Sequence, residues 1–247
     1  SSWKLERSYY STGEKDSVFG KGWSFPYASR IYRDTQDTEN IRVHMETITG
    51  HSVCFEKQGD AWVNQCPGTS RFSLTVREDA GCPEQEVFLL ADAEDHTLCV
   101  YDRQGNLSYV EYPNHLRLLL SYNAEGLERI TTPLGNVLEV ECRGGRILQI
   151  TDEIGRRTQY RYAGEYLADV VHTDEGITHY EYDENGHIMS VTDQNGSRYI
   201  ENEYDEKGRI TRQGFIRYLP MMMYTAGIRS ITARPAKRRS MNTTTSS

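Results

Sequence analysis

Apolar and polar positions along the chain alternate in short runs, and glycines separate these runs at regular intervals. Between Tyr101 and Phe215, a Tyr-x-x-x-Gly pattern recurs about every 20 residues, with a second glycine near the middle of each period. Clear copies begin at Tyr101, Tyr122, Tyr182 and Tyr204, and blurred copies lie around residues 141–145 and 162–164. A fixed period is typical of stacked repeats in which each unit buries its apolar face against its neighbours.

The runs between glycines are about eight residues long, which suits strands and is short for helices. Each period therefore predicts one β-hairpin. The dipeptides Asn185-Gly186 and Asn195-Gly196 are strong tight-turn signals, because both residue types tolerate φ > 0. The glycines expected to set the turns are Gly105, Gly126, Gly155, Gly176, Gly186, Gly196 and Gly208.

One arm of each hairpin carries two apolar residues that are three positions apart. These pairs are Leu107/Val110, Leu127/Ile130, Ile147/Ile150, Leu167/Val170 and Ile188/Val191. Odd spacing cannot place both residues on one face of a regular strand, so either a bulge intervenes or both faces are partly covered. We favour the bulge, because bulges also curve a sheet. On the other arm, Tyr160 and Tyr162 should share a face, as should Tyr180 and Tyr182.

Three regions differ in character: a β-rich amino-terminal part (1–100), the hairpin array (101–215) and a basic tail (216–247). The tail carries six basic and no acidic residues, whereas the rest has 22 basic and 36 acidic ones, so +6 contrasts with 22 − 36 = −14. The tail is either a basic arm for an anionic partner or an end that is disordered or frameshifted. We favour the second interpretation, because no further hairpin follows Phe215. Its basic residues are Arg217, Arg229, Arg234, Lys237, Arg238 and Arg239.

The net charge of −8 gives no support to a nucleic-acid partner. No run approaches the roughly 18 apolar residues of a membrane span. No signal peptide is visible, and the chain begins at Ser1 like a piece of something longer. The cysteines are odd in number and lack a C-x-x-C pair, which fits neither a full disulfide framework nor a zinc site, although one bridge among the first four stays open. They are Cys54, Cys66, Cys82, Cys99 and Cys142.

No catalytic, cofactor-binding or metal-binding residue is predicted, and we expect the chain not to be an enzyme. The acidic turns beginning at Asp152 and Asp193 lack the further oxygen ligands of a calcium loop, so their carboxylates should accept backbone N–H bonds. The seven histidines are scattered without zinc-ligand spacing, and no G-x-S-x-G elbow is present. The glycines around Gly20-Lys21-Gly22 should permit a bend that tucks Trp23 into the core.

These repeats resemble the Rhs (rearrangement hot spot), or YD-repeat, family of bacterial polymorphic-toxin proteins. The family pattern Y-D-x-x-G-x-L-x-x-V-T-D-x-x-G is matched throughout by residues 182–196, and partly by 152–155 and 204–210. Independent support comes from residues 5–11 and 19–24 (LERSYYS and FGKGWS), which resemble the segment that precedes the repeats in such proteins. The resemblance covers about residues 1–215.

The resemblance implies an all-β fold of tandem hairpins in a curved, spiralling sheet, here a partial wall of a β-shell. Such shells enclose a carboxy-terminal toxin domain, which is missing from this chain, and related shells occur in insecticidal toxin complexes and teneurins. The implied function is structural, in a secreted or cell-surface bacterial protein. The alternative is a carbohydrate- or surface-binding module without cargo, in which tyrosines such as Tyr180 stack on a cell-surface glycan; the competing interpretation is that they pack across strands.

Overall fold

A computed structural model describes residues 6–11, 16–34, 41–79 and 82–215, and the expectation for the tail (216–247) lies outside them. The described residues form three antiparallel sheets, and their only helix is the short 3-10 turn η1 (Pro26–Ala28). The prediction of an all-β fold is confirmed.

The first two sheets come from the amino-terminal residues. The two-stranded sheet pairs β1 (Ser8–Tyr9) with β2 (Trp23–Ser24). The four-stranded sheet is built from β3 (Ile31–Arg33), β4 (Arg42–Glu46), β5 (Ser52–Gln58) and β6 (Ala61–Asn64).

The third sheet has 14 strands, each paired with its neighbours in sequence. It starts at Phe72, so its first strands come from the amino-terminal region. Its strands are β7 (Phe72–Asp79), β8 (Cys82–Asp92), β9 (Thr97–Tyr101), β10 (Leu107–Glu111), β11 (Arg117–Asn123), β12 (Gly126–Thr131), β13 (Val137–Arg143), β14 (Arg146–Asp152), β15 (Arg157–Ala163), β16 (Tyr166–Val171), β17 (Ile177–Tyr182), β18 (Ile188–Thr192), β19 (Arg198–Tyr204) and β20 (Ile210–Phe215).

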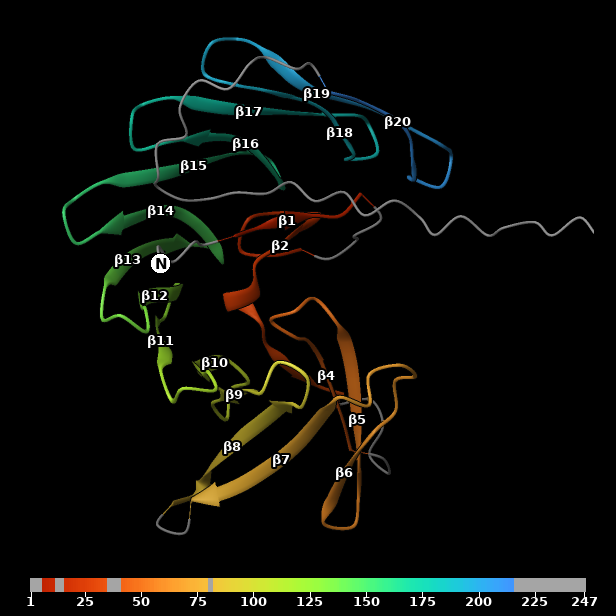
Figure 1. Cartoon of the computed structure of the whole chain (residues 1–247), viewed down its shortest axis with the longest axis vertical. Helices are drawn as coiled ribbons and strands as arrows, with labels where there is room; N and C mark the ends of the chain where they lie inside the picture. Colours follow the sequence, from red (N-terminus) through yellow and green to blue (C-terminus); the bar gives the residue numbers. More distant parts are fainter. Residues whose placement is uncertain (1–5, 12–15, 35–40, 80–81, 216–247) are drawn as a thin grey trace, which may run out of the picture.

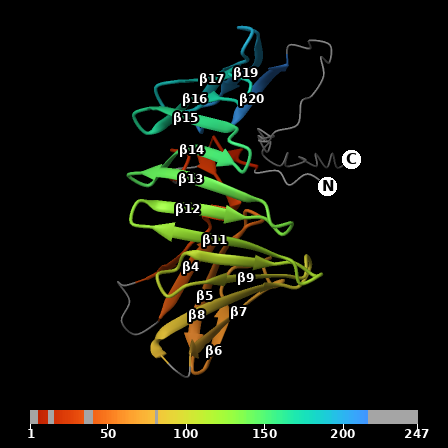
Figure 2. The same ribbon diagram turned by 90° about the vertical axis from the view of Figure 1, so that its left-hand side faces the viewer.

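The large sheet bends into an open arc, with β1 and β2 on its concave side (Figure 1). Seen from its left-hand side in Figure 1, the hairpins lie one above another like rungs (Figure 2). Successive Tyr-Asp periods are therefore adjacent ribbons, as the spacing predicted. The sheet stays open, because β7 and β20 at its two ends are not paired with each other.

The predicted bulge is present in the hairpins of the array. In the β11–β12 pair, for example, Tyr122 lies opposite Leu127 while Ser121 lies opposite Arg129, so one extra residue interrupts the ladder. This shift turns both members of the apolar pair inward, and Leu127 and Ile130 are 3% and 0% exposed. The same shift precedes Cys142, Tyr162, Tyr182 and Tyr204.

Two turns differ in detail from what the sequence predicted. At the Asp183 turn only Gly186 has positive φ, at 82°, and Asn185 does not. The Gly186 N–H bonds to the Asp183 carbonyl (3.0 Å) and the Asp183 N–H to the His187 carbonyl (2.9 Å), which makes a three-residue loop that ends in a left-handed glycine. In the turn that begins at His172, Glu175 takes that left-handed position (φ 67°) and Gly176 follows it.

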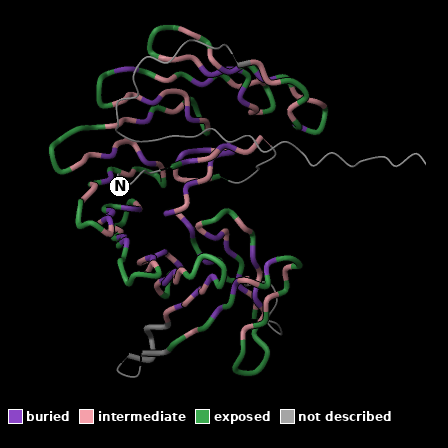
Figure 3. The backbone as a smooth tube through the Cα atoms, viewed as in Figure 1, coloured by how far each residue is buried: buried purple, intermediate pink, exposed green. Residues whose placement is uncertain are grey.

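Buried positions recur on the strands from β7 to β19, and most turn residues are exposed (Figure 3). The core lies on the concave side, where the amino-terminal residues contribute large aromatic side chains. Among them Phe19 is 1% and Trp23 is 2% exposed. We call residues 6–11 and 16–31, which run along this side, the inner segment.

Candidate functional site

The inner wall of the arc is held by one hydrogen bond that repeats from hairpin to hairpin. Four tyrosines of the array donate their hydroxyl to the carbonyl of the first apolar residue one period earlier, beside the bulge where the ladder is interrupted, whereas the Tyr101 hydroxyl pairs with that of Ser29. The bonds are Tyr122 to Leu107 (2.9 Å), Tyr162 to Ile147 (2.6 Å), Tyr182 to Leu167 (2.7 Å) and Tyr204 to Ile188 (2.7 Å). Burial raises the pKa of Tyr204 to about 12, so its hydroxyl remains a donor at neutral pH.

This bond explains why tyrosine, and not phenylalanine, marks the period. From the sequence, the repeat tyrosines are expected to hold adjacent hairpins together, but the hydrogen bond through which they do so was not foreseen. A signal was available, because the tyrosine and the acceptor residue are separated by 15 or 16 positions in all four cases.

The inner segment is bonded to the wall at several successive hairpins. The Trp23 indole N–H donates to the Tyr182 hydroxyl (3.1 Å), and the Tyr9 hydroxyl donates to the Gly186 carbonyl (2.8 Å). The backbone bond from the Ile147 N–H to the Val18 carbonyl (2.9 Å) adds a contact further along the arc. Positive φ at Gly20 and Gly22 supplies the bend that was expected to bury Trp23.

Arg7 lies at the centre of this contact and was not singled out from the sequence. Its guanidinium is 5.1 Å from the Trp23 ring centroid and 5.6 Å from that of Tyr160, and it donates to the Tyr180 hydroxyl at 2.9 Å. The side chain is buried, and its Nε and one terminal nitrogen have no hydrogen-bond partner. Aromatic faces stabilise a desolvated cation, so Arg7 joins the segment to the wall mainly through these rings.

The tyrosines considered for glycan stacking are covered by the inner segment. Tyr160 and Tyr180 are 3% and 4% exposed, and their rings pack against Phe19 (4.8 Å) and Trp23 (5.2 Å). The packing interpretation is therefore correct: Val170 and Val191 lie opposite these tyrosines on the neighbouring strands, and the amino-terminal residues add aromatic partners. These positions give a glycan partner no support.

The acidic turns act as predicted. Asp193 Oδ1 accepts the N–H groups of Asn195 and Ser197, both at 2.9 Å. The carboxylate at Asp152 accepts two turn N–H groups in the same way. Within the described part of the chain, no group of three or more acidic, histidine or cysteine side chains is arranged to hold a metal ion.

The histidines and cysteines serve local contacts. His179 faces Asp169 on the adjacent strand, 2.6 Å from Nδ1 to Oδ1, as a cross-strand pair. Cys54, Cys66 and Cys99 are free thiols, so none of these three forms a disulfide.

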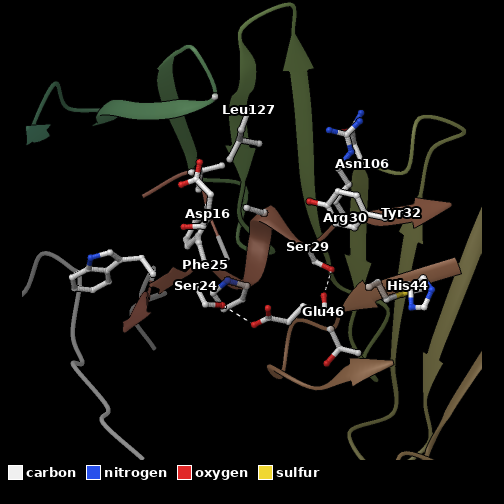
Figure 4. Close-up of a pocket in the computed structure, with 18 of the residues that line it drawn as sticks. Asp16, Ser24, Phe25, Ser29, Arg30, Tyr32, His44, Glu46, Asn106 and Leu127 are labelled. Carbon is white, nitrogen blue, oxygen red and sulfur yellow. Dashed lines mark hydrogen bonds between the residues drawn. The ribbon is translucent and has the colours of Figure 1, made fainter. Parts of the chain in front are cut away.

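A cavity of about 780 Å³ lies between the inner segment, the four-stranded sheet and the wall. Figure 4 shows Leu127 of the wall on one side and Phe25 and Glu46 on the other. The Glu46 carboxylate accepts a bond from the Ser24 hydroxyl (2.9 Å). The volume of the cavity is in the range of small-molecule sites.

The wall of this cavity contains the least regular repeat. Cys142 stands where the other periods have tyrosine, and its Sγ lies 3.1 Å from the Leu127 carbonyl. Gly126 lies directly beside it, since a Cβ placed there would be 3.4 Å from the Cys142 Cβ. Both residues line the cavity.

An open, curved meander with a lined concave face defines this chain as a wall segment of a β-shell. The Teneurin YD-shell family model matches residues 89–238, more than half of the chain, and a domain of unknown function (DUF6531) matches residues 2–55. The chain therefore belongs to the Teneurin YD-shell family, and the suspected relationship to Rhs/YD-repeat shell proteins is confirmed.

Other comparisons are weaker. The Photorhabdus luminescens Tc holotoxin pore is 13% identical with a TM-score of 0.38, over 71% of this chain and 11% of that chain. The chain thus spans about a tenth of that structure's length, and the family assignment rests on the family model. No curated protein matches. In the described ranges, no helix has the length and apolar character needed to cross a bilayer.

Proposed function

We propose that this chain is a non-enzymatic part of a shell that encloses a toxic carboxy-terminal domain of a longer protein and helps to deliver it. The observation that carries the proposal is the arc itself: consecutive hairpins form one continuous curved wall of 14 strands with its core on the concave side. A wall of this kind separates an interior from solvent.

The regular bonding supports a mechanical role. Bulges recur from hairpin to hairpin and curve a sheet, and four tyrosine bonds join successive periods beside them. Family and fold are both of a structural kind. We further propose that the protein acts outside the producing bacterial cell, where a sequestered toxin has to be carried.

The DNA downstream of the coding region tests the proposal most cheaply. Read in all frames, it should encode further Tyr-Asp periods followed by a variable carboxy-terminal domain. A downstream region that encodes neither would contradict enclosure.

A direct test uses the complete polypeptide in native limited proteolysis. The carboxy-terminal domain should resist trypsin in the intact protein and become cleavable when urea opens the shell. A domain that is cut equally fast under both conditions would show that it lies outside the wall.

A further inference from the structure

At the cavity, two neighbouring positions of the repeat both carry small residues. In two later periods, the residue before the first apolar position packs its ring against the tyrosine of the next period. Tyr166 lies 4.9 Å from Tyr182, and His187 lies 4.7 Å from Tyr204, measured between ring centroids. The equivalent pair at the cavity is Gly126 and Cys142, and neither carries a ring.

The hydrogen bond at this repeat is weakened as well. The Leu127 carbonyl is the equivalent of carbonyls that accept a phenolic O–H in the other periods, but its partner is the Cys142 thiol. Burial raises the pKa of this thiol to about 11, so it stays protonated at neutral pH. A thiol is a weak donor, and a carbonyl oxygen has two lone pairs, so Leu127 can accept a stronger bond.

The charged groups of the lining already have partners in the protein. Arg146 forms an ion pair with Asp16 and bonds to the Ser17 carbonyl (2.8 Å). Glu46 accepts the Ser24 bond described above. A charged ligand would have to displace these partners, whereas a neutral ring would not.

We propose that the cavity binds a phenolic ring in the space beside Gly126 and Cys142. The ring packs against the wall where a repeat tyrosine would lie, and its hydroxyl donates to the Leu127 carbonyl. A free phenol and the tyrosyl side chain of an enclosed peptide share this chemistry. The proposal concerns the cavity alone and does not depend on the enclosure of a toxin.

Titration calorimetry of the full chain with p-cresol, the tyrosine side chain as a free molecule, tests the site. Cys142→Tyr fills the space with the residue of the other periods and should weaken binding about tenfold or more. Cys142→Ala keeps the space open and should bind within about threefold of the wild type. Equal affinity for wild type and Cys142→Tyr would overturn the proposal.

Two further measurements guard against a misfolded variant and a nonspecific cavity. In the wild-type chain, saturating p-cresol should slow alkylation of Cys142 by iodoacetamide about tenfold, as followed by mass spectrometry; an unchanged rate would contradict the site. 4-Methylcyclohexanol has the same outline without an aromatic face, and binding as tight as that of p-cresol would refute recognition of a ring.

A tyrosine tripeptide with blocked ends distinguishes the two sources of the ring. Binding of this peptide, with its loss in Cys142→Tyr, would assign the cavity to a peptide side chain. Binding of p-cresol alone would assign it to free phenols. If neither binds, the proposal is wrong.

Discussion

The two halves of the inner wall differ in what covers them. From β15 to β18 the concave face packs against Arg7, Phe19 and Trp23, and its tyrosines are buried or partly buried. From β11 to β14 the same kind of wall borders the cavity. The hairpins have similar pairing in both halves, so the geometry of the repeat does not depend on whether the inner segment covers it. The effect of a substitution, in contrast, should depend on that cover.

The largest difference is expected between two turn glycines, one in the lined half and one in the turn between the two halves. Gly186→Val forces a β-branched residue to φ 82° and places its Cβ 2.3 Å from the Tyr166 hydroxyl, so it should prevent stable folding. Gly155 has a similar φ (81°) but no atom within 4 Å of an added Cβ. Gly155→Val should therefore fold with a stability loss of only about 1–2 kcal/mol. Thermal melts followed by circular dichroism compare the two, and equal melting temperatures would remove the steric distinction.

Substitutions at Arg7 measure how much the inner segment contributes to the stability of the fold. Arg7→Ala removes the bond to Tyr180 and leaves a hole among aromatic rings, which should cost about 3 kcal/mol. Arg7→Met keeps most of the volume and removes donors that have no partner, so it should regain more than half of that loss. Urea unfolding gives both values. If methionine is as damaging as alanine, the charge and not the packing attaches the inner segment.

The tyrosine bonds provide a finer comparison. The Tyr182 hydroxyl has two partners, because it donates to Leu167 and accepts from Trp23, whereas the Tyr122 hydroxyl donates to Leu107. Tyr182→Phe should cost about 2 kcal/mol and Tyr122→Phe about 1 kcal/mol. A larger loss of stability for Tyr122→Phe than for Tyr182→Phe, measured in the same urea series, would show that the inner segment adds nothing to the tyrosine bond.

The period, the strands and the bulge were all predictable from the sequence, because each is a local property. Alternation, glycine spacing and the three-residue step between Leu127 and Ile130 depend on neighbouring residues. The contacts of Arg7 and Trp23 were not predictable, since they join positions more than 150 residues apart, and no local period encodes such pairs.

The cavity was also missed, although the sequence contained part of its signal. The copy of the repeat around Cys142 was recognised as blurred. That this copy marks a cavity can be inferred only if Gly126 is known to lie beside Cys142, and that follows from the pairing of successive hairpins. Departures from a repeat thus become informative once the register between periods is known.

The smallest changes in stability are expected for substitutions in turns that the inner segment does not influence. Glu175 holds the left-handed position that glycine takes in other turns, with φ 67°. Relief of that strain in Glu175→Gly favours the folded state by about 1–2 kcal/mol, while the greater freedom of glycine in the unfolded chain offsets about 0.5–1 kcal/mol. The net gain should be about 0.5–1 kcal/mol in urea unfolding.

His115 supplies the matched control for that turn. It has a similar φ of 59°, but its Nδ1 lies 3.2 Å from a Glu111 carboxylate oxygen. His115→Gly relieves the same strain and loses this exposed contact, so its gain should be smaller than that of Glu175→Gly. The reverse order would mean that the backbone at Glu175 is unstrained. In that case Gly176, and not Glu175, would provide the freedom that the turn needs, as the glycine spacing first indicated.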